Sequence, residues 1–194
     1  MKTYIYLLFL REYIRLVIRL TKIFIFSSVF VFGIKRVPLL GIGPKILLSI
    51  CPFFVLFGIL NIIYYPLFQI PISYYLLVVI GSILITIGIL VFVYSERILS
   101  SAHNSSILVT TKTYAYLRHP MYASWGLLIL PGIFCIVNSW ILFFILFFYY
   151  LSFRIFLKKE ERFLIKKYGK IYEHYKKKVN AFFPKLKKYK PEKN

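Results

Sequence analysis

The sequence predicts an all-α membrane protein, built as a bundle of transmembrane helices. Hydrophobic residues make up 60% of the chain, whereas soluble domains average about 45–50%. The 26 Lys and Arg residues face only six acidic residues, which gives a formal net charge of +20. Such a chain needs one surface for lipid and a second, basic surface for anionic lipid headgroups. Because of the high apolar content, these headgroups are expected as partners, and nucleic acid is not.

Four apolar runs are predicted to cross the membrane, which takes about 20 residues in a helix. They are residues 46–65, 72–94, 121–137 and 140–157. Pro52 and Pro131 fall inside two of these runs. A proline is tolerated there because neighbouring helices can satisfy the carbonyl that it leaves unpaired.

The N-terminal residues 1–34 allow two interpretations. Arg11, Arg15 and Arg19 recur every four residues, so they share one face of a helix. This helix either lies in the membrane interface or forms a further span from about residue 16 to residue 34. In the second case Arg19 and Lys22 reach outward to the headgroups.

The distribution of Lys and Arg predicts the orientation of a multi-pass integral membrane protein. Neither the connection at residues 66–71 nor the turn at Asn138 and Ser139 contains a cation, whereas residues 158–194 contain 14 of the 26. Positively charged loops remain on the cytoplasmic side. The basic loops and the C-terminal tail are therefore expected to be cytoplasmic.

The C-terminal region is predicted to form an amphipathic helix on the cytoplasmic surface. Its apolar residues follow a spacing of three to four, at Leu164, Tyr168, Ile171, Tyr172, Tyr175 and Val179. Residues 185–194 are predicted to be a disordered basic tail. With no internal repeat and no boundary, residues 1–194 are expected to form a single domain.

The stretch YLRHPMYAS places a cation and a helix breaker at the entry to the third span. Pro120 suits the first turn of a helix, and amide hydrogens at a helix start, together with Arg118, favour an anion. The hairpin of the last two spans returns the chain to the same membrane face, where Glu160 and Glu161 follow. These glutamates favour a cation, so the expected ligand carries both signs.

Each of these features alone has a structural interpretation. An arginine at a helix end commonly anchors to headgroups, a glutamate pair among lysines is commonly solvated, and a single histidine such as His119 is commonly structural. The pairing of both charge types across one hairpin favours a binding site. Cys51 and Cys135 are isolated in apolar runs and indicate neither a disulfide framework nor a metal site.

The C-terminal half resembles the superfamily of isoprenylcysteine carboxyl methyltransferases and phospholipid methyltransferases, which are integral membrane enzymes. The resemblance covers about residues 108–184 and depends on an ordered set of motifs. These are Arg118-His119-Pro120-Met121-Tyr122, Glu160-Glu161, Tyr168-Gly169, Tyr172, Tyr175 and Pro184.

The resemblance implies S-adenosylmethionine as methyl donor, bound at the cytoplasmic edge, and no metal. It implies a lipophilic acceptor entering from the bilayer, either a prenylcysteine-type carboxylate or a phospholipid amine. The implied catalytic residues are Arg118, His119 and Glu160. The implied cofactor-binding residues are Arg118, His119, Pro120, Tyr122, Glu160, Glu161, Tyr172 and Tyr175.

The chain departs from the family pattern at three places. Lys112-Thr113 stands where many relatives have Gly-Pro, and Ser124 stands where many have Gly. Asn180-Ala181 occupies the position of an arginine in the last motif, which weakens the case for a carboxylate acceptor.

Two other functions remain open. Sterol or steroid reductases resemble the same C-terminal segments but use NADPH; the glutamate pair and the short chain favour methyl transfer instead. A non-enzymatic membrane protein that binds anionic lipid through its basic tail is the third interpretation.

Overall fold

The computed structural model describes residues 15, 42–102, 107–185 and 187–190. Within these ranges every regular element is helical, which confirms the predicted all-α class. The two interpretations of residues 1–34 concern a segment that, apart from residue 15, lies outside the described residues. They stay predictions.

The described chain forms two compact units. The first contains the described residues up to Ile72 together with Val137–Leu157, and the second contains Ser73–Ile136 and the chain from Lys158 onward. The prediction of a single domain stays a prediction. All of the predicted site residues belong to the second unit.

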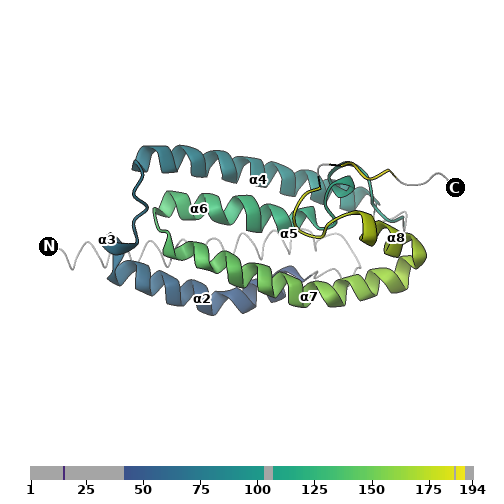
Figure 1. Ribbon diagram of the computed structural model, residues 1–194, viewed down its shortest axis with the longest axis horizontal. Coiled ribbons are helices and arrows are strands. Elements are labelled where there is room, and N and C mark those ends of the chain that lie inside the picture. Colours follow the sequence, from purple (N-terminus) through teal and green to yellow (C-terminus); the bar gives the residue numbers. More distant parts are fainter. Residues whose placement is uncertain (1–14, 16–41, 103–106, 186, 191–194) are drawn as a thin grey trace. The chain divides into compact units, whose positions relative to one another are not determined.

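In the first unit, helix α2 (Gly43–Ile63) lies beside the first part of α7 (Phe144–Tyr168) (Figure 1). Phe53 and Phe148 stack between them with ring centroids 3.6 Å apart. At one end of this unit the side chain of Asn138 accepts a hydrogen bond from the Ile70 amide at 3.0 Å. Asn138 has a φ of 55°, a left-handed conformation that asparagine tolerates in turns.

In the second unit, α4 (Tyr74–Ala102) lies alongside the consecutive helical segments α5 (Pro120–Ser124), η4 (Trp125–Ile129) and α6 (Leu130–Val137) (Figure 1). The closest approach involves glycines on both sides. A Cβ atom added to Gly81 would lie 2.5 Å from the carbonyl oxygen of Gly132. Small residues allow membrane helices to approach this closely, and the approach fixes the path of the chain that begins at Pro120.

Segment η4 is a π-helical turn that lies shortly before Pro131. Proline has no amide hydrogen, so it cannot donate to the Leu127 carbonyl four residues earlier. The Leu130 amide donates to the carbonyl of Trp125, five residues earlier. Single π-helical turns of this kind occur inside α-helices.

Four helices among the described residues are long and apolar enough to cross a membrane, as predicted. They are Gly43–Ile63, Tyr74–Ala102, Pro120–Val137 and Ile141–Tyr168. The second and fourth extend beyond the predicted ends at residues 94 and 157. A helix can continue past the apolar region because its backbone bonds are internal. In the extension of α4, the buried Ser95 hydroxyl donates to Thr113 at 3.1 Å.

An amphipathic helix forms near the C-terminus, as predicted, but the apolar positions assigned to it are divided between two helices. Helix α7 ends at Tyr168, Gly169 has a φ of +56°, and α8 covers Lys170–Lys178. The positive φ re-aims the chain, so Ile171 is 64% exposed instead of facing the core. Tyr172 and the other core residues of α8 do lie on the buried face.

The disordered basic tail expected at residues 185–194 stays a prediction, but two residues of this segment make backbone hydrogen bonds in the structure. The Lys185 amide donates to the Tyr116 carbonyl, and the Tyr189 amide donates to the Ala115 carbonyl at 2.9 Å. The ring of Tyr189 also packs against Tyr175, with centroids 5.2 Å apart. One aromatic residue thus anchors an otherwise basic segment.

The glycine contact between α4 and α6 yields a first prediction. Gly81→Ala should destabilise the protein by about 1–3 kcal/mol, because the new methyl group meets a backbone oxygen that cannot move freely. Ser82→Ala, at the exposed neighbouring position, is the control and should change stability little. Thermal unfolding in detergent measures both, and equal stability of the two variants would contradict the close approach.

Candidate functional site

The predicted site begins at the turn that leads into α5. The amide of Arg118 donates to the carbonyl of Asn180 at 2.8 Å, and the amide of His119 donates to that of Ala181 at 3.2 Å. Pro120 is buried as the first residue of α5. The C-terminal segment therefore takes up the two amide hydrogens ahead of the helix, which are not available to an anionic ligand.

The side chain of Arg118 is surrounded by protein acceptors. Its Nη1 pairs with Oε1 of Glu161 and lies 3.5 Å from the hydroxyl of Tyr172, and its Nε donates to the carbonyl of Val179 at 2.8 Å. The other carboxylate oxygen of Glu161 lies 2.7 Å from Nζ of Lys176. Each oxygen of this buried carboxylate is therefore paired with a cation.

The adjacent Glu160 faces a different set of groups. Consecutive residues of a helix point about 100° apart, so the two glutamates cannot share one set of partners. Glu160 hydrogen-bonds to Tyr122, and its Oε1 lies 3.8 Å from Nδ1 of His119. Its Oε2 is buried and has no hydrogen-bond partner among the described residues, although 25% of the side chain is exposed. Such an atom is unusual in a folded protein and could accept a hydrogen bond from a ligand.

His119 is held in its neutral form. Burial, and then the positive charge of Arg118, lower the pKa of His119 to about 3. Its contact with Glu160 is therefore not an ion pair at pH 7. The imidazole stacks on the ring of Tyr122 with centroids 5.9 Å apart, which fixes its orientation.

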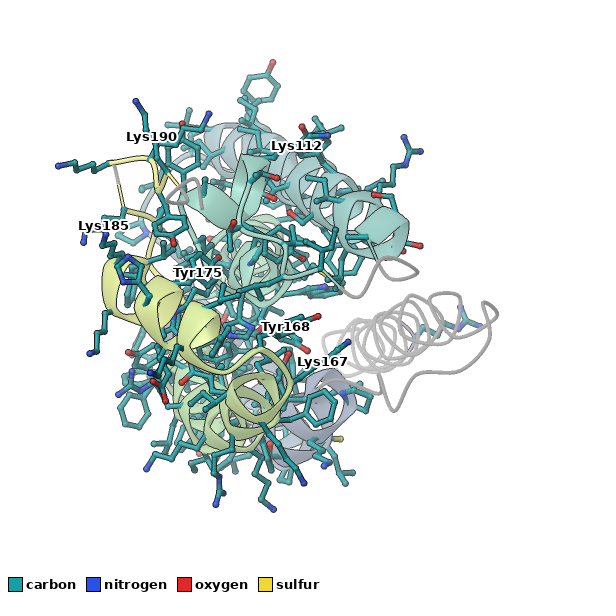
Figure 2. The ribbon with its side chains drawn as sticks, turned by 90° about the vertical axis from the view of Figure 1, so that its right-hand side faces the viewer. Lys112, Lys167, Tyr168, Tyr175, Lys185 and Lys190 are labelled. Atoms are coloured by element: carbon teal, nitrogen blue, oxygen red, sulfur yellow. The ribbon has the colours of Figure 1, made fainter. Side chains whose placement is uncertain are left out.

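Tyr172 and Tyr175 of α8 are buried beside this turn. The hydroxyl of Tyr175 donates to the carbonyl of Tyr114, and burial raises the pKa of Tyr175. Burial also raises the pKa of Tyr172 to about 12, with Arg118 opposing the shift. Both phenols are protonated at pH 7. Tyr175, which Figure 2 labels, is only 2% exposed, and its role as a cofactor ligand stays a prediction.

The structure thus divides the predicted residues between two clusters. Arg118, Glu161 and Tyr172 form one, and His119, Tyr122 and Glu160 form the other. Prediction from the sequence missed Lys176 as the second cation on Glu161. Its position one helical turn after Tyr172 placed it on the same face, but a lysine among lysines gave no further signal.

The departures from the family pattern leave the backbone of the turn intact. Lys112 has a φ of 56°, the left-handed region that favours the glycine found there in many relatives. Asn180 and Ala181 contribute carbonyls to the turn. The hydroxyl of Ser124 donates to the carbonyl of Met121 at 2.8 Å, so its hydrogen bond stays within α5.

A family model described as phospholipid methyltransferase matches residues 72–171, slightly more than half of the chain. The chain belongs to the phospholipid methyltransferase family. This membership confirms the resemblance, and with the four apolar helices it makes the protein an integral membrane protein. No curated protein and no solved structure matches significantly. The family match includes Arg118 and both glutamates but ends before Tyr172.

The buried, neutral His119 yields a prediction about acid stability. The unfolded chain takes up a proton at this histidine near its ordinary pKa of 6.5, whereas the folded protein does so only near pH 3. Stability is therefore lost as the pH falls below 6.5, by up to about 1.4 kcal/mol per pH unit. In His119→Gln this contribution is absent, so the loss of stability between pH 6.5 and 4.5 should be smaller.

Unfolding temperatures of the two proteins across this range test the prediction. Comparing variant with wild type removes the contribution of the carboxylates, which titrate in both. The same replacement at the half-buried His174 of α8 is the control. Parallel curves for wild type and His119→Gln would contradict a buried neutral imidazole.

Proposed function

We propose that this protein transfers a methyl group from S-adenosylmethionine to a lipophilic acceptor, either a phospholipid amine or a prenylcysteine-type carboxylate. The observation that carries the proposal is the buried Oε2 of Glu160, which lacks a hydrogen-bond partner among the described residues. Family membership supports methyl transfer. The remaining support comes from the charge and hydrogen-bonding capacity of the site.

The site residues fit the amino-acid end of this donor. Its ammonium group would donate to Oε2 of Glu160, which satisfies an otherwise unsatisfied buried atom. Arg118 and Lys176 together exceed the charge of Glu161 by one positive charge. This excess favours the carboxylate of the donor nearby, even though Arg118 itself is engaged with protein groups.

Bound S-adenosylmethionine would supply a methyl group on a positively charged sulfur. The protein's own contribution is to hold donor and acceptor close and in line. The buried ring of His119, stacked on Tyr122, gives the site a rigid wall. The acceptor would enter sideways from lipid along the apolar helices.

The two acceptor types make different demands on the site. A carboxylate acceptor needs no base, whereas an amine must lose a proton. With a pKa near 3, His119 is a weak base at pH 7. Glu160 is the titratable side chain next to His119. We propose that its carboxylate accepts the proton that an amine acceptor must lose.

Family membership and the glutamate pair favour methyl transfer over the reductase alternative. Lipid binding as the only function would leave the buried ion pair of Arg118 and Glu161 and the unsatisfied oxygen of Glu160 unexplained. Surface adsorption needs exposed cations alone.

We also propose that the basic face of the C-terminal segment contacts anionic lipid headgroups on the cytoplasmic side. The lysines from residue 176 to residue 190 that the structure describes are exposed. Figure 2 shows Lys185 and Lys190 pointing away from the helices on the same side. Each cation near an anionic surface contributes about 1 kcal/mol.

The donor site is tested by equilibrium binding of S-adenosylmethionine to the purified protein in detergent. Glu160→Gln should weaken binding about 10- to 100-fold, because it removes a charged hydrogen bond to the ammonium group. Glu173→Gln, at an exposed position of α8, is the matched control and should bind like the wild type.

Absence of binding by folded wild-type protein would contradict the proposed function and favour a test with NADPH. Where binding is found, transfer of a labelled methyl group to phosphatidylethanolamine and to a prenylcysteine identifies the acceptor.

The lipid surface is tested by native mass spectrometry in mixed micelles. Replacing Lys185, Lys187, Lys188 and Lys190 with serine should reduce the number of bound phosphatidylglycerol molecules and leave binding of phosphatidylcholine unchanged. High salt should abolish the difference, since exposed charges are screened. Equal phosphatidylglycerol binding by variant and wild type would exclude this surface.

A further inference from the structure

The buried carboxylate of Glu161 binds two cations that come from different segments of the second unit. Arg118 precedes α5, and Lys176 belongs to α8. The side chains of Arg118 and Glu161 are only 9% and 8% exposed. That of Lys176 is 40% exposed, so it is the member of this cluster that reaches the surface.

The helical geometry of α7 directs Glu161, and not Glu160, toward Arg118. A second contact is needed to keep the Glu161 side chain in this one setting. In the structure Lys176 holds the second oxygen of Glu161 at 2.7 Å. With both oxygens engaged, Glu161 cannot turn away from Arg118 without breaking two ion pairs.

We infer that Lys176 is a positioning residue of the donor site, an inference that rests on the proposed function. It fixes Glu161 on Arg118, so that Glu160 alone presents a carboxylate oxygen to the ligand. Lys176 acts through Glu161 and does not itself touch the donor. The family match ends at residue 171, so this contribution of α8 comes from the structure.

The same contact joins α8 to the turn before α5. Arg118 also donates to the carbonyl of Val179, immediately after α8, and its amide donates to Asn180. Loss of Lys176 would leave a buried carboxylate with one cation fewer, which destabilises the arrangement. Both the ligand site and the backbone contacts around it should then loosen.

The inference is tested with Lys176→Met, which removes the charge but keeps most of the apolar stem. Lys177→Met, at the exposed neighbouring position, is the matched control, and Lys176→Arg restores the charge. The double variant Lys176→Met/Glu161→Gln, measured with the two single variants, completes a double-mutant cycle. Two readouts are taken: equilibrium binding of S-adenosylmethionine, and hydrogen exchange of the Arg118 and His119 amides in the ligand-free protein.

Lys176→Met should weaken donor binding about tenfold and speed exchange at both amides, whereas Lys177→Met should change neither. Lys176→Arg should recover most of the binding. In the Glu161→Gln background the Lys176→Met change should have almost no further effect, because the charge that Lys176 positions is gone.

Three results would overturn the inference. They are equal behaviour of Lys176→Met and Lys177→Met, failure of Lys176→Arg to restore binding, and additive losses in the double variant. If Lys176→Met does not fold, Lys176→Gln and the Glu161→Gln background supply the same comparison. Absence of donor binding by the wild type overturns the proposed function, whereas unchanged exchange in Lys176→Met overturns the positioning role alone.

Discussion

The ion pair between Arg118 and Glu161 is the constraint on which the candidate site depends. Both side chains are buried, and a buried charge that loses its partner is costly. Arg118 therefore contacts three segments at once: α7 at Glu161, the first turn of α8 at Tyr172, and the chain that leaves α8 at Val179. A single guanidinium thus gathers segments that are far apart in the sequence.

The pair also explains why two glutamates stand next to each other. Because neighbouring positions on α7 point in different directions, one carboxylate is used inside the protein and the other faces His119 and Tyr122. Glu161 neutralises cations that the fold has buried. Glu160 keeps one oxygen that no described residue satisfies, and this oxygen is the one that the proposed function assigns to the ligand. Two identical residues acquire different roles from the phase of one helix.

The spans were predictable because a long uncharged run has few stable environments other than lipid. Their ends were not, since a helix continues wherever its backbone bonds remain internal, as α4 does to Ala102. The motifs identified both glutamates but not the cation that α8 brings to Glu161, whose position depends on the turn at Gly169. The contact of Tyr189 with Tyr175 was also not predicted, because the basic composition of that segment gave no sign of it. The two cations that pair with Glu161 could be identified only from the structure.

Two different kinds of interaction hold the second unit together, which is consistent with its membership of a membrane methyltransferase family. Between α4 and α6, glycine contacts and apolar side chains determine the packing without buried charge. Around Arg118, hydrogen bonds and ion pairs determine it, and residues of the C-terminal segment supply part of these contacts. Apolar packing persists in lipid, whereas ion pairs respond to the charges around them. The second unit thus combines a region whose packing needs only small and apolar residues with a polar region whose arrangement depends on the pairing of a few charges.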